Sequence, residues 1–67
     1  MTLGESLPLE IARVRDTVLP EYLALGESGQ FAAVFMRHAL DLASKATSEG
    51  DVAGMIRAHE ALKGCQL

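Results

Sequence analysis

The chain has 67 residues and a mass of 7.2 kDa, which is room for a single domain over residues 1–67. Six Lys and Arg residues against nine Asp and Glu residues leave a net charge of -3, with no basic stripe for a nucleic-acid backbone. The one cysteine, Cys65, excludes an internal disulfide and is typical of a reducing compartment. With neither a basic leader nor a long apolar run in the sequence, we expect a cytoplasmic protein that does not enter a membrane.

The first predicted helix begins at Ser6, a residue type that often caps helix N-termini, with Pro8 in its first turn. Apolar residues then recur at steps of three and four, as on one face of an amphipathic helix: Leu7, Ile11, Val14, Val18, Tyr22 and Leu25. The charged residues off this stripe are expected to face solvent: Arg13, Arg15, Asp16 and Glu21.

Pro20 interrupts this stripe, because in a regular helix its ring would clash with the carbonyl group of Asp16. Two arrangements satisfy the pattern. Either one helix is kinked between Asp16 and Pro20, or two short helices meet there and Pro20 lies in the first turn of the second.

The second predicted helix runs from about Gln30 to Glu49, after a break at residues 26–29 in which Ser28 is a candidate N-cap. Its apolar residues cover more than one narrow stripe, which predicts a central helix with apolar neighbours on two sides. They are Phe31, Val34, Phe35, Met36, Ala39, Leu40, Leu42, Ala43 and Ala46.

The stretch from Thr47 to Asp51 ends one helix and begins the next, because Gly50 suits a left-handed backbone and Asp51 can cap the following helix. That third helix, Val52 to Lys63, has an expected core face of Val52, Met55, Ile56, His59 and Leu62, and Gly64 ends it. The predicted fold is therefore an all-α, antiparallel three-helix bundle, or four helices with a break at Pro20. Its second and third helices form a hairpin.

His38, His59 and Cys65 are the residues that could carry chemistry, and a hairpin folded at Gly50 allows His38 to approach Cys65. A structural zinc site needs four Cys or His ligands and a catalytic site usually three, in spacings that the chain lacks. A catalytic thiol would also need an orienting group and an oxyanion site. We therefore predict no catalytic residue, no metal site and no cofactor, with His59 half-buried on the core face and Cys65 incidental.

A DNA-binding helix-turn-helix is the closest motif, because the small-residue, turn-glycine and core positions are filled by Ala46, Gly50 and Ile56. Charged residues, however, stand where that motif buries apolar ones: Lys45, Glu49 and Asp51. The recognition helix would offer only two cations, Arg57 and Lys63. A small nucleic-acid-associated regulator is thus an alternative function, and a Cys/His-dependent enzyme is a further one.

An aromatic and thioether surface is the preferred candidate for binding, and it consists of Tyr22, Phe31, Phe35 and Met36. We expect at least half of these side chains to lie in the core and the others to bind a protein partner. Since so short a chain forms a small core, we also expect a homodimer that buries Phe35 or Met36 across a two-fold axis.

Two segments of the chain resemble small uncharacterised helical proteins encoded in bacteriophages and prophages: Gly4-Glu5-Ser6-Leu7-Pro8-x-Glu10-Ile11-Ala12-Arg13 and Gly50-Asp51-Val52-x-x-Met55-Ile56-Arg57-x-x-Glu60-x-Leu62-Lys63-Gly64. The resemblance implies a bacterial cytoplasm and an accessory protein that acts on host or phage proteins. It supplies no catalytic residue. The predicted function is a non-enzymatic protein-binding module.

Overall fold

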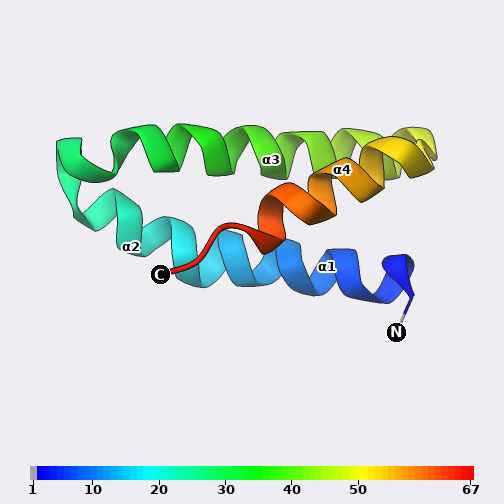
Figure 1. Ribbon diagram of the computed structural model, residues 1–67, viewed down its shortest axis with the longest axis horizontal. Helices are drawn as coiled ribbons and strands as arrows, with labels where there is room; N and C mark the ends of the chain where they lie inside the picture. Colours follow the sequence, from blue (N-terminus) through cyan, green and yellow to red (C-terminus); the bar gives the residue numbers. More distant parts are fainter. Residues whose placement is uncertain (1) are drawn as a thin grey trace.

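The computed structural model describes residues 2–67, which are all-α and include no strand. The helices are α1 Leu3–Arg13, α2 Leu19–Ala24, α3 Gln30–Glu49 and α4 Val52–Lys63, with a π-helical segment at Val14–Val18 and a 3-10 turn at Gly26–Gly29. In Figure 1, α1 and α2 follow one another along one long side, α3 forms the other side, and α4 lies between α3 and α1. The molecule measures 35 × 20 × 15 Å.

Helix α1 begins at Leu3, earlier than the sequence predicts, and its N-cap is Thr2. The Thr2 backbone is extended, with φ -91 and ψ 164, and its Oγ1 accepts a hydrogen bond from the N–H group of Glu5 at 3.3 Å. The expectation that Ser6 caps this helix is therefore wrong. Ser6 lies inside α1, as does Pro8, and its hydroxyl group is used in a contact with another helix.

The π-helical segment explains how the chain passes Pro20 without a break. The N–H group of Leu19 donates to the carbonyl group of Val14, five residues earlier, so the turn before Pro20 is wider than an α-helical turn. A wider turn relieves the clash between the proline ring and the carbonyl group of Asp16. The structure thus combines the two predicted arrangements, because the helical path is continuous and Pro20 lies in the first turn of α2.

The connection between α2 and α3 differs from its prediction in two places. Gly29 precedes α3 and no side chain caps this helix, so Ser28 is not its N-cap. Leu25, expected on the buried stripe, is 60% exposed, because α2 ends at Ala24 and the chain turns away from the core there.

The turn between α3 and α4 forms as the sequence predicts. Gly50 has a left-handed backbone with φ 69, and the N–H groups of Gly50 and Asp51 donate to the carbonyl groups of Thr47 and Ala46 at 3.2 and 2.9 Å. The Asp51 carboxylate accepts from the N–H group of Gly54 at 3.0 Å. The predicted bounds of both helices, the left-handed glycine and the aspartate cap are confirmed.

Helix α3 contacts both α4 and α2, which agrees with the expectation of neighbours on two sides, and most of the residues that it buries are small. The buried residues of α3 are Ala33, Met36, Ala39, Ala43 and Ala46. Helix α4 faces them closely: a Cβ atom added at Gly54 would lie only 3.0 Å from the Cβ atom of Ala46. Large side chains do not fit between helices that approach this closely, so the aromatic residues of α3 point elsewhere.

The core face of α4 is rotated from the predicted one. Val52 and Ile56 are 60% and 51% exposed, whereas Gly54, Ala58 and Leu62 are buried. Hydrophobicity alone predicts that the large apolar side chains of α4 form its core face. Because α4 lies close to α3, small residues occupy much of that face instead. Only Met55, His59 and Leu62 of the predicted face are buried or half-buried, and they lie on the part of α4 that turns towards α1.

Gly50→Ala is expected to lower the free energy of unfolding by about 1–2 kcal/mol, because an L-residue is strained in the left-handed conformation. The matched control is Gly4→Ala, at a helical position where the nearest atom to an added Cβ is 3.9 Å away. The control variant should leave the free energy of unfolding unchanged or raise it slightly, since alanine is a better helix former than glycine. Chemical denaturation of both variants checks the prediction, and equal midpoints would contradict it.

Candidate functional site

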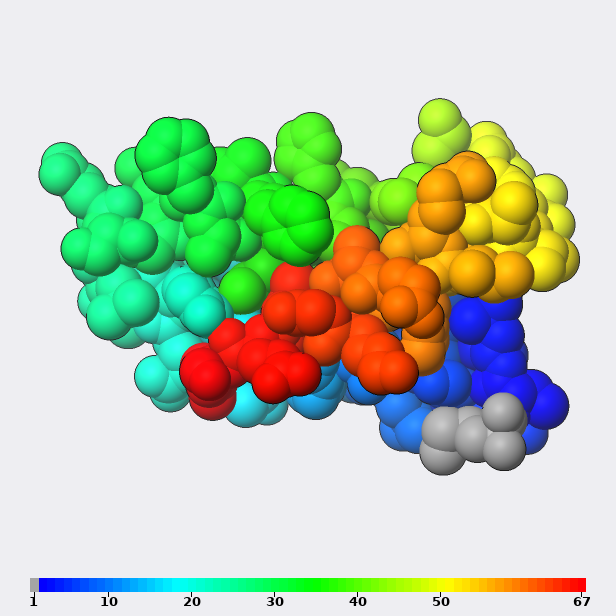
Figure 2. Space-filling view, viewed as in Figure 1, coloured from blue at the N-terminus to red at the C-terminus, as the bar shows by residue number. Residues whose placement is uncertain are grey.

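Helix α3 carries a line of exposed side chains, four of them apolar, here named the outer stripe: Phe31, Val34, Phe35, His38 and Leu42. Their spacing of three and four residues places them on one helix face. Phe31 is 92% exposed and Phe35 56%, and these are the two phenylalanines of the whole chain. Figure 2 shows side chains of α3 standing out along the edge of the molecule that α4 and the C-terminal segment leave uncovered.

A hollow lies beside the first turn of α3, with a volume of about 370 Å³. It is lined by Glu27 of the 3-10 turn and by Gln30, Phe31 and Val34 of α3. The hollow therefore combines apolar walls from the outer stripe with one carboxylate. A complementary ligand would present an apolar group and a positive charge side by side.

The four predicted interaction residues lie in three different surroundings. Phe31 and Phe35 belong to the outer stripe, whereas Met36 is 3% exposed and packs in the core. Tyr22 is half-buried, and its hydroxyl group donates to the carbonyl group of Gln66 at 2.7 Å. The structure thus brings two of the four residues together on one surface.

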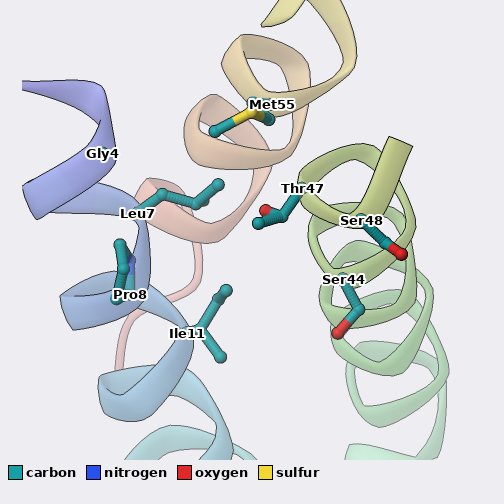
Figure 3. A pocket seen from close by; sticks show the side chains of 8 residues that line it. All are labelled: Gly4, Leu7, Pro8, Ile11, Ser44, Thr47, Ser48 and Met55. Atoms are coloured by element: carbon teal, nitrogen blue, oxygen red, sulfur yellow. The ribbon is translucent and has the colours of Figure 1, made fainter. Parts of the chain in front are cut away.

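A groove between α1 and α3 is the second concave feature, and the sequence did not predict it. Its volume is about 340 Å³ and its lining residues are Gly4, Leu7, Pro8, Ile11, Ser44, Thr47, Ser48 and Met55. Figure 3 shows Leu7 and Ile11 of α1 pointing across the gap towards Thr47 of α3, with Met55 of α4 at one end. None of these residues is ionisable, so the groove offers no general acid or base.

Ser6 and His59 form the closest contact between polar side chains of α1 and α4, with 2.6 Å between Oγ and Nε2. A hydroxyl group beside an imidazole is the arrangement that activates a nucleophile, but catalysis also needs an oriented imidazole and oxyanion donors. Neither residue lines the α1–α3 groove or the hollow beside Phe31. The contact therefore ties two helices together, and His59 is half-buried as predicted.

Cys65 is a core residue, which corrects its description as incidental. It is 5% exposed, and its thiol donates to the carbonyl group of Ala61 at 3.3 Å. Burial raises the pKa of the Cys65 thiol, although the nearby charge of Arg13 acts in the opposite direction. A protonated thiol is a poor nucleophile at neutral pH.

His38 does not complete a site with Cys65, because His38 is exposed on the outer stripe while Cys65 is buried. In the part of the chain that the structure describes, no three His, Cys, Asp or Glu side chains come close enough together to hold a metal ion.

Arg13 holds the end of α4, although the sequence predicts that it faces solvent. Its guanidinium group donates to the carbonyl groups of Leu62 and Cys65, both at 2.8 Å, and to the Glu10 carboxylate at 2.8 and 3.0 Å. The Leu62 carbonyl group also accepts a hydrogen bond from the N–H group of Cys65 at 3.0 Å, and the positive charge of Arg13 is favourable at a helix C-terminus. The spacing of Glu10 and Arg13 is a visible sequence signal, but nothing local connects the pair to α4.

Arg13→Lys should lower the free energy of unfolding by about 1 kcal/mol, because an ammonium group keeps the charge but cannot reproduce the branched set of donors. The expected loss in the free energy of unfolding is modest because 36% of the Arg13 side chain is exposed to solvent. Arg15→Lys is the matched control, since Arg15 is 58% exposed and bonds to its neighbour Asp16. Thermal or chemical unfolding compares the two, and equal losses would refute the assigned role of Arg13.

Comparison with known protein families, with curated proteins and with solved structures finds no match for this chain. Among residues 2–67, no helix combines the length and the apolar character that crossing a bilayer requires.

Proposed function

We propose that this chain is a non-enzymatic protein-binding module and that the outer stripe of α3 is its binding surface. The observation that carries the proposal is that both phenylalanines lie exposed on this stripe, beside a hollow, while four alanines and Met36 fill the buried face of the same helix. Burying a phenylalanine is worth about 1.5–3 kcal/mol, so the monomer forgoes a substantial stabilisation at each. Exposed aromatic clusters of this kind are typical of protein interaction sites.

The charges around the stripe favour a protein partner over a nucleic acid. The exposed charged residues near it have both signs: Glu27, Arg37, Asp41 and Lys45. Two of the six cations are engaged elsewhere, because Arg13 holds the end of α4 and Arg15 pairs with Asp16. A mixed rim around an apolar centre resembles a protein interface, whereas a nucleic-acid surface is predominantly basic.

The proposal includes the scaffold and the setting. The scaffold is an antiparallel helical bundle in which α3 and α4 form a hairpin, so that α4 and α1 support α3 from behind and leave its outer stripe open. The setting is a bacterial cytoplasm, where the resemblance to phage and prophage proteins suggests an accessory protein acting on a host or phage protein.

Position-specific photo-crosslinking in bacterial cells tests the binding surface. A photoreactive amino acid replaces Val34 on the outer stripe or, as the matched control, Val52 on α4; these valines are 47% and 60% exposed. We expect crosslinked protein adducts from position 34. Position 52 should give adducts in much lower yield or none. Phe31→Asp in the same chain should abolish the adducts of position 34, because it places a charge at the centre of the surface.

Phe31→Asp should leave the unfolding midpoint of the purified chain unchanged, since the side chain is 92% exposed and contributes little to the core. Equal adduct yields from positions 34 and 52, or no adduct from position 34, would contradict the proposal.

A further inference from the structure

The outer stripe of α3 is complementary to itself when a second α3 is laid against it in the opposite direction. Phe31 and Leu42 lie about 16 Å apart along the helix, with Phe35 and His38 between them. A two-fold axis midway between Phe35 and His38 therefore brings Phe31 of each chain to the level of Leu42 of the other. It also brings Phe35 to the level of His38.

We propose that the occupant of the outer stripe is a second copy of this chain, paired antiparallel in this register; the inference rests on the binding surface proposed above. The hollow beside Phe31 is the receiving site, and it takes Leu42 and Lys45 of the other copy. These two residues lie three positions apart on one face of α3 and so enter the same site together.

The chemistry of the hollow matches these two side chains. Phe31 and Val34 offer apolar walls to the methyl groups of Leu42, which is 37% exposed in the single chain. The Glu27 carboxylate at the same hollow offers a counter-charge to the ammonium group of Lys45. Each dimer contains this contact twice, because a two-fold interface repeats every pairing.

Charge also selects the register and the direction. Sliding the two helices by about one turn brings Glu49 of one copy to the level of Glu27 of the other, which places two carboxylates together. A parallel pairing would set each Glu27 beside Glu27 and each Lys45 beside Lys45. Of these three arrangements, the antiparallel register that pairs Phe31 with Leu42 combines apolar contact with opposite charges.

The small size of the core favours a second copy of the chain as the occupant of the outer stripe. A chain of 67 residues forms a small core, and here five of the twelve hydrophobic residues buried within residues 2–67 are alanine while both phenylalanines are exposed. The total accessible surface is 4430 Å², so an interface of about 800 Å² per subunit would cover about a fifth of it. Met36 is buried in the single chain, which leaves Phe35 as the residue near the axis.

Sedimentation equilibrium of the purified full chain over a wide concentration range is the first test. We expect a dimer that dissociates on dilution. Phe35→Asp should weaken association at least roughly a hundredfold, because each dimer loses two apolar contacts. The matched control is Ile56→Asp on α4, since Ile56 is 51% exposed and Phe35 56%, and it should leave association unchanged.

An exchange of charges is the decisive test of the register. Glu27→Lys and Lys45→Glu should each weaken self-association about tenfold at low ionic strength, because both symmetric contacts become repulsive. An equimolar mixture of the two variants should regain the wild-type affinity, since both contacts of the mixed dimer then join opposite charges. Within one chain these residues are more than about 20 Å apart, so pairing inside a monomer cannot produce this recovery.

A monomer at every concentration would overturn the inference, and a mixture that associates as weakly as its components would overturn the register. Circular dichroism of each variant confirms that it is folded. A different result would contradict the proposed binding surface itself. If the purified chain is monomeric but Val34 still crosslinks to a different protein, the binding surface stands and the second copy does not; if Val34 crosslinks to nothing, the surface itself is wrong.

Discussion

The close packing of α3 against α4 is the constraint on which the other features depend. Alanines line the buried face of α3, and Gly54 and Ala58 meet them from α4. Helices that approach through such small residues leave no room between them for a phenylalanine or a leucine. Phe31, Val34 and Phe35 are instead exposed on the outer stripe, whereas Met36 and Leu40 pack with the core.

Polar contacts from α1 and α2 add to the apolar packing that holds α4 and the segment after it in place. Arg13 bonds the last carbonyl groups of α4, His59 meets Ser6, and Tyr22 bonds the segment that follows. The contacts of His59 and Arg13 are part-buried, whereas the contact of Tyr22 is exposed. Such contacts fix how far α4 is rotated, and hence which of its side chains face α3.

The groove between α1 and α3 and the hollow beside Phe31 differ in what they can do. The groove between α1 and α3 is lined without an ionisable side chain, and Leu7 and Met55 in it are continuous with the core. The hollow beside Phe31 lies next to side chains that the core does not use, and it includes a carboxylate. Recognition of a protein surface needs both apolar area and directional charge, and the hollow offers them together.

The sequence by itself determined the helical class, the bounds of α3 and α4 and the turn at Gly50, because these features depend on local backbone preferences and short-range hydrogen bonds. It also identified Phe31 and Phe35 as candidate binding residues. It also predicted the buried stripe of α1 and the π-helical segment, where Leu7, Val14 and Val18 are buried. Only the tertiary structure decided which faces of α3 and α4 are buried. Hydrophobic periodicity ranks residues by size and polarity, whereas the distance between two helices determines which side chains fit, and most of the residues that α3 and α4 bury are alanine or glycine. The role of Arg13 was equally invisible, since its acceptors lie at the far end of the chain and meet it only after folding.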